Sequence, residues 1–78
     1  MIQELESVAL TVDLPEHNLK KDDLGTVVLT HPEGCGFEVE FLTLEGETLA
    51  VISLHPNEVR AITRNEIAHA RRFVGLRE

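Results

Sequence analysis

A single predicted hairpin constrains the fold more than any other feature of this sequence. Residues 37–54 read FEVEFLTLEGETLAVISL, and apolar side chains alternate with other residues on both sides of a central Glu-Gly pair. This alternation is typical of two half-buried strands. A tight turn centred on Glu45 and Gly46, with a positive φ at Gly46, would join them. The register then pairs, in order toward the turn, Phe37 with Leu54, Val39 with Ile52, Phe41 with Ala50 and Thr43 with Thr48. A slip by one residue would put Phe and Val opposite Leu and Ser, so we expect this register to hold.

The opposite face of the predicted hairpin carries apolar side chains that the hairpin cannot cover by itself. In the same register Leu42 lies opposite Leu49 and Glu40 opposite Val51, and further glutamates border them. An apolar centre with a charged rim is typical of a protein interface. We therefore predict a partner-binding surface made of Glu38, Glu40, Leu42, Leu49 and Val51. Closure of a barrel, or cover by the chain's own tail through Phe73 or Val74, are the alternatives.

Three further strands are expected from β-branched and alternating segments. Residues 8–14, VALTVDL, place Val8, Leu10, Val12 and Leu14 on one face, and a surface loop follows over residues 15–23. Residues 24–31, LGTVVLTH, form the next strand, with Val27 and Leu29 on a shared face. If PEGCG (32–36) connects this strand to the hairpin, His31 faces Phe37, Leu29 faces Val39 and Val27 faces Phe41. Residues 59–62, VRAI, give a short last strand.

The C-terminal segment, TRNEIAHARRFVGLRE, has a different pattern. Thr63 and Glu66 fit a capping box, and Ile67, Ala70 and Val74 share one helical face. Gly75 suits the end of such a helix. Residues 67, 69, 71 and 73 also alternate as a strand would, but we favour the helix. This basic amphipathic segment, Arg64 to Arg77, is a second candidate binding surface; the alternative is a helix packed on the barrel with its arginines outward. The fold predicted as a whole is mainly β: a small SH3-like barrel of about five strands (residues 1–62), with a short C-terminal helix or extended tail (63–78) in the same single domain.

Charge and composition narrow the classes of partner. The net charge is −7; twelve acids against Lys20 and Lys21 give residues 1–58 a charge of −10, and five arginines against two glutamates give residues 59–78 a charge of +3. The acidic part would repel phosphate backbones, so direct nucleic-acid binding is not expected, whereas a basic protein would be steered toward it. One cysteine, no signal-peptide pattern in MIQELESV and no long apolar run favour the cytoplasm, a prokaryotic source and no membrane association.

The residues most often used in catalysis occur in patterns that do not favour an enzyme. His31 and Cys35 lie four apart, but a closed zinc site needs two more ligands, and none of the recognised zinc spacings occurs. The glycines and proline around Cys35 make a poor platform for a nucleophile. The paired acids alternate outward, and no phosphate-binding loop occurs. We expect no catalytic residue, no metal and no cofactor.

Two motifs resemble a known family. DLPEHNLKKDDLGTVV matches the pattern D-L-P-E-x-x-L-K-x-x-D-x-G-T-V-V at Asp13, Leu14, Pro15, Glu16, Leu19, Lys20, Asp23, Gly25, Thr26, Val27 and Val28. FEVEF followed by a Glu-Gly turn matches a second motif at Phe37, Val39, Glu40, Phe41, Glu45 and Gly46. Over roughly residues 5–62 the chain resembles the prokaryotic family of domain of unknown function 4926. The resemblance implies small stand-alone proteins and a fold, but no activity; a link with toxin–antitoxin or accessory proteins is an analogy.

The function expected from these features is a non-catalytic protein-binding module. An acidic antitoxin-like or immunity-type protein that caps a basic protein fits the charge best. The alternative is a self-associating accessory or structural subunit, a homo-oligomer formed through the hairpin edge or the tail.

Overall fold

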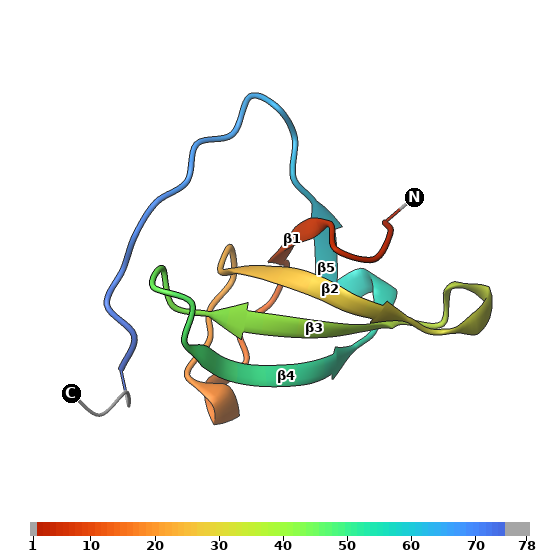
Figure 1. Ribbon diagram of the computed structural model, residues 1–78, viewed down its shortest axis with the longest axis horizontal. Coiled ribbons are helices and arrows are strands. Elements are labelled where there is room, and N and C mark those ends of the chain that lie inside the picture. The colour runs from red at the N-terminus through yellow and green to blue at the C-terminus, as the bar shows by residue number, and fades with distance from the viewer. Residues whose placement is uncertain (1, 75–78) are drawn as a thin grey trace.

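Five antiparallel strands form one open sheet in the computed structural model, which describes residues 2–74. In chain order the strands are β1 (Ser7–Leu10), β2 (Leu24–Thr30), β3 (Phe37–Leu42), β4 (Thr48–Leu54) and β5 (Val59–Ala61). Their spatial order is β4-β3-β2-β1-β5, so β4 and β5 are the edges (Figure 1). Among the described residues helical structure is limited to the short 3-10 turns η1 (Pro15–His17), η2 (Pro32–Gly34) and η3 (Pro56–Glu58). The mainly β prediction is confirmed.

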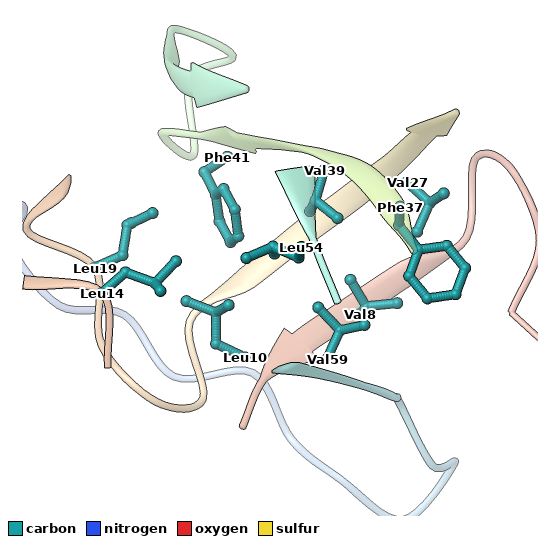
Figure 2. Close-up of a cluster of buried hydrophobic side chains, with 10 residues drawn as sticks. All are labelled: Val8, Leu10, Leu14, Leu19, Val27, Phe37, Val39, Phe41, Leu54 and Val59. Atoms are coloured by element: carbon teal, nitrogen blue, oxygen red, sulfur yellow. The ribbon is translucent and has the colours of Figure 1, made fainter. Parts of the chain in front are cut away.

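The core lies on one face of the curled sheet, and every strand contributes to it (Figure 2). Along β3, buried residues alternate with half-buried glutamates, as the period of a strand requires. Leu14 and Leu19 form an isolated bridge at the two ends of η1 and close one end of the core. The cluster comprises Val8, Leu10, Leu14, Leu19, Val27, Phe37, Val39, Phe41, Leu54 and Val59.

The β3–β4 hairpin has the predicted register except beside its turn. Phe37–Leu54, Val39–Ile52 and Phe41–Ala50 pair as expected. The turn is one residue longer than expected: the N–H of Gly46 donates to the carbonyl of Thr43 (2.9 Å), and the N–H of Thr43 donates to the carbonyl of Glu47 (2.8 Å). Gly46 has the positive φ that was predicted, +90°. A type I turn followed by such a glycine is the usual three-residue hairpin loop.

This longer turn changes the pairs next to it. Leu42 faces Thr48, where the prediction had Leu42 facing Leu49 and Thr43 facing Thr48, and a bulge separates Leu42 from Phe41. Those two predicted pairs are therefore wrong. Leu49 is left without a cross-strand partner and is half-buried.

The predicted β2–β3 register is also wrong. Val27 faces Val39 and Thr30 faces Phe37, with a shift between Val27 and Leu29. The shift leaves Val28 as an extra residue, which reverses the face of every later residue in the strand. Leu29 is consequently 49% exposed instead of lying in the core with Val27.

The first strand is shorter than its alternation predicted. β1 ends at Leu10, and Val12 is 37% exposed at a bend. The backbone of Leu10 bonds to the β1–β2 loop through Asp22 and Asp23, and Thr11 N–H donates to the Glu58 carbonyl. The chain therefore turns away from the sheet before Val12.

The predicted C-terminal helix is not observed over residues 63–74. The capping-box residues instead form one turn, in which Thr63 N–H donates to the Glu66 carboxylate (2.8 Å) and Glu66 N–H donates to the Thr63 carbonyl (3.1 Å). Nη1 and Nη2 of Arg60 in β5 donate to the two carboxylate oxygens of Glu66 (2.9 and 2.7 Å). This pairing turns the chain away from a helical path. Gly75, the predicted helix end, lies outside the described residues.

Candidate partner-binding surface

Four of the five predicted surface residues lie on the outer face of the sheet. Glu40 on β3 faces Val51 on β4, and Glu38 lies two residues from Glu40, so their side chains share the face opposite the core. Leu42 lines a depression on this face together with Glu40. Val51 is 56% exposed and Leu42 is 40% exposed. The fifth residue, Leu49, lies at the bulge, is half-buried and has no cross-strand partner.

Two leucines of β2 extend this surface, and the sequence patterns did not identify them. Leu29 faces Glu38 after the bulge, and Leu24 lines the same depression as Leu42 and Glu40. Leu24 and Leu29 are each about half exposed. Alternation within β2 alone assigns Leu29 to the core, so only knowledge of the bulge could have found it. We call Leu24, Leu29, Glu38, Glu40, Leu42 and Val51 the outer face.

The two glutamates of the outer face are held in place by neutral or titratable donors. The Glu38 carboxylate accepts the Ser53 hydroxyl (2.5 Å) and lies 2.6 Å from Nε2 of His31. The Ser53 hydrogen bond, followed by His31, lowers the pKa of Glu38 below its usual value. Glu40 accepts the hydroxyl of Thr48 (2.7 Å). Both side chains are thereby oriented, and Glu38 stays ionised at neutral pH.

The outer face is shallow. Its depression, lined by Ser7, Leu24, Gly25, Thr26, Glu40 and Leu42, has a volume of about 140 Å³. Sites for small ligands are typically about 300–1,000 Å³ and enclose most of the ligand. An apolar surface this shallow, bordered by carboxylates, suits a protein partner better than a small molecule.

The described part of the chain's own tail, residues 63–74, does not cover the outer face. Phe73 packs against the core cluster, and Val74 lines a cleft beside the β1–β2 loop. Arg71, which precedes these two residues in the sequence, donates hydrogen bonds to Asp23 of that loop. The exposure of Leu42 and Val51 is measured with the tail present, so the alternative in which Phe73 or Val74 covers these residues is wrong.

The His31–Cys35 stretch is a connection between β2 and β3. Cys35 is exposed and follows η2, where Glu33 and Gly34 have positive φ. His31 pairs with Glu38 and not with Cys35. Within residues 2–74 no three His, Cys, Asp or Glu side chains converge as a metal-binding group.

Comparison with known proteins identifies one family. The family model described as domain of unknown function (DUF4926) matches residues 4–61, which include all five strands and end before the tail. No curated protein and no solved structure matches the chain. Over the described part of the chain, no helix has the length and apolar character needed to cross a membrane.

Proposed function

Because this chain belongs to the family of domain of unknown function (DUF4926), whose description assigns no activity, we propose its function from its surface: a non-catalytic protein-binding module whose outer face docks a basic protein. One observation carries the proposal. Leu24, Leu29, Leu42 and Val51 are 40–56% exposed on one face, beside the two oriented carboxylates of Glu38 and Glu40. Apolar side chains at the centre of an interface supply most of the binding energy, and charges at its rim select the partner.

The charge of the strand-forming part supports a basic partner. Residues 1–58 carry −10, and among the described residues the carboxylates of the outer face bond to Ser53, Thr48 and His31 and to no arginine. Their charge is thus available to a partner. An antitoxin or immunity-type protein, which caps a basic surface of a toxic protein, is the biological role that we propose. We place this complex in the cytoplasm of a prokaryote, because the chain has one cysteine and no disulfide framework.

The proposal includes an SH3-like barrel as the finer description of the fold. Five short antiparallel strands, a long loop between β1 and β2, and a 3-10 turn before β5 support it. Sheets of this kind bury one face and leave the other to solvent, which is what exposes the outer face.

The experiment compares proteins captured from the native host by three baits: the unaltered chain, Val51→Asp and Ile67→Asp. Ile67 is 92% exposed in the tail and serves as the matched control. We expect a basic protein that is retained by the unaltered chain and by Ile67→Asp, and lost with Val51→Asp. Retention of every captured protein by a folded Val51→Asp chain would rule out the outer face as the docking site.

Self-association is the second candidate, and the β4 edge favours it. β4 is a seven-residue edge strand, TLAVISL, without a charge or a proline. Such an edge readily pairs with another strand. Antiparallel pairing of two copies about Val51 would place Glu47 opposite His55 of the second copy, without like charges in register. The other edge, β5, is less suited, because Arg60 at its centre would face itself. Sedimentation as a monomer at tens of micromolar would exclude this candidate.

A further inference from the structure

A second surface of the molecule is already occupied, by the chain's own tail. After β5 the chain turns at Thr63–Glu66, passes outside the sheet and returns to the β1–β2 loop near η1 (Figure 1). There Arg71 and Val74 line a cleft together with Asp13, Pro15, Asn18, Leu19 and Lys20 of that loop. This cleft, which we call the loop cleft, shares no lining residue with the depression of the outer face.

Arg71 makes the polar part of the contact. Its Nε and Nη2 donate to the two carboxylate oxygens of Asp23 (2.9 and 2.5 Å), and Nη2 also donates to the Asn18 carbonyl (3.1 Å). Asn18 presents this carbonyl from a left-handed conformation at the end of η1. A two-pronged arginine–carboxylate pair fixes direction as well as position. The loop therefore recognises the guanidinium by geometry, and a lysine could not reproduce the contact.

Asp23 is prepared for this role by the loop itself. Its carboxylate accepts the Lys20 N–H (2.7 Å), and its side chain is only 18% exposed. Burial raises the pKa of Asp23, but hydrogen bonds from Arg71 and Lys20 outweigh it and hold the pKa below the usual 3.8. The carboxylate is thus ionised and already oriented on the loop side.

Apolar side chains make the rest of the contact. Phe73, two residues after Arg71, is half-buried against the core cluster, and Val74 lines the loop cleft but stays 69% exposed. An arginine followed two residues later by an aromatic therefore places its charge against Asp23 and its ring against the core cluster. That spacing is the recognisable feature of the occupant.

Residues 61–70 connect β5 to the part of the tail that contacts the loop, and they make few contacts of their own. Residues 61–70 are all exposed, and within residues 2–74 their only ion pair to another part of the chain is Arg60–Glu66. The β1–β2 loop residues that line the cleft lie within the segment that matches the family, and Arg71, Phe73 and Val74 lie outside it. The site and its occupant are therefore separate parts of the chain, joined by an exposed connection.

We propose that the loop cleft is a docking site for an extended basic segment of a protein partner, with arginine at one position and an aromatic residue two positions later. In this chain Arg71, bonded to Asp23, and Phe73, packed against the core cluster, hold these two positions in cis and compete with that segment. A second copy's tail would fit equally well, but a tethered tail has an effective concentration in the millimolar range. The cis arrangement therefore wins at ordinary protein concentrations. This site is additional to the outer face and does not depend on it.

The test measures binding of a fluorescent peptide with the sequence of residues 66–74, EIAHARRFV, to full-length chains. We expect Arg71→Ala/Phe73→Ala, whose tail is weakened, to bind the peptide about tenfold more tightly than the unaltered chain, because a tail affinity of about 0.1 mM competes with a millimolar effective concentration. Arg72→Ala is the matched control: it removes the same charge from the next residue, whose side chain makes no hydrogen bond to another described residue. It should bind like the unaltered chain.

A further substitution identifies the site. Asp23→Asn in the weakened-tail chain should lower peptide affinity at least tenfold, because a neutral amide loses the charge that Arg71 recognises. If the double variant is poorly folded, by the amide spectrum of β3 and β4, Arg71→Ala alone replaces it. Equal affinity for the unaltered and weakened-tail chains, or no effect of Asp23→Asn, would overturn the proposal. So would an unaltered chain that sediments as a dimer with exchanged tails.

Discussion

Gly25 provides the sharpest test of how the core is packed. It lies on β2 opposite Val8 and is buried. A methyl group at its Cβ position would lie 2.6 Å from a Val39 methyl and 2.9 Å from the Phe41 ring. Carbon atoms pack best at about 3.5–4.0 Å, so the neighbours would have to move by about 1 Å. Val39 and Phe41 are 0% and 1% exposed and lie at the centre of the core, where there is little space to yield.

The free energy follows from two opposing effects of Gly25→Ala. Overpacking of a core costs about 1–3 kcal/mol, whereas Gly→Ala at an ordinary φ recovers about 0.4–1 kcal/mol from the unfolded state. We therefore expect a net loss of about 1–2 kcal/mol. In a domain of this size that lowers the melting temperature by about 5–15 °C. Urea unfolding followed by circular dichroism measures it.

A double-mutant cycle with Val39→Ala tests the cause. Val39→Ala alone should destabilise by about 2–3 kcal/mol through the cavity it leaves. With Gly25→Ala added, the new methyl enters that space, so the double variant should be about 1–2 kcal/mol more stable than the sum of the single changes predicts. Strict additivity, or a Gly25→Ala chain as stable as the unaltered one, would refute the packing argument.

Three further predictions concern other parts of the chain. Gly36→Ala should lower the free energy of unfolding by at least about 3 kcal/mol, because Gly36 has a φ of +149° and a Cβ there would lie 2.6 Å from the Leu54 carbonyl oxygen. Gly34→Ala, which would meet no atom within 4 Å, should lower it by about 1 kcal/mol. Urea unfolding midpoints compare the two variants. In the same assay Leu10→Ala should destabilise the fold by about 2–5 kcal/mol and Val12→Ala by less than about 1 kcal/mol, because Leu10 is buried and Val12 is not. Equal losses would indicate that Val12 is also in the core, as the longer predicted strand requires. The Arg60 hydrogen bond is the main cause that lowers the pKa of Glu66 from 4.5 to about 2. The contribution of Glu66 to folding stability is therefore fully present above pH 4.5 and is lost as the pH falls through 2. The amide chemical shifts of residues 63–66 should titrate near pH 2, and a midpoint at 4.5 would contradict the pairing.

The β3–β4 hairpin could be predicted because two local signals agreed. Alternation placed Phe37, Val39 and Phe41 on one face, and Gly46 marked the only position in the turn that needs a positive φ. The error of one residue in the turn, which mispaired Leu42, arose because the two-residue and three-residue loops both use a glycine here. Alternation specifies the face of a strand but not the length of a turn.

The β2–β3 register could not be predicted because a bulge leaves little trace in the sequence. Residues 27–29, between Thr26 and Thr30, are all apolar (VVL), so no polar residue indicates where the face reverses. Leu29 therefore appeared to belong to the core when it belongs to the outer face. The same error hid one of the residues that now makes the outer face a better candidate interface than the sequence alone suggested.

The tail failed as a helix for an energetic reason. Short helices are marginal in water unless an apolar face is buried, and residues 63–74 have too few turns to offset nucleation. Here Glu66 bonds to Arg60, Arg71 bonds to Asp23, and Phe73 packs against the core cluster. Long-range partners of this kind have no signature in local sequence spacing.

The acidic side chains of this protein fall into two groups: those that pair with its own arginines, and those of the outer face, which bond to hydroxyl groups and His31. This division supports an external partner for the second group. The acidic excess of residues 1–58 predicts attraction to a basic segment, and the first such segment is the chain's own tail. Arg60 and Arg71 account for the ion pairs to Asp22 and Asp23. Neither arginine pairs with the outer face, where Glu38 and Glu40 keep their charge and bond to hydroxyl groups and His31. Arg60 of β5 and Arg71 of the tail thus neutralise two carboxylates of the β1–β2 loop and leave the apolar face with its carboxylates open, so a basic partner would meet an available site there and a competitor at the loop cleft.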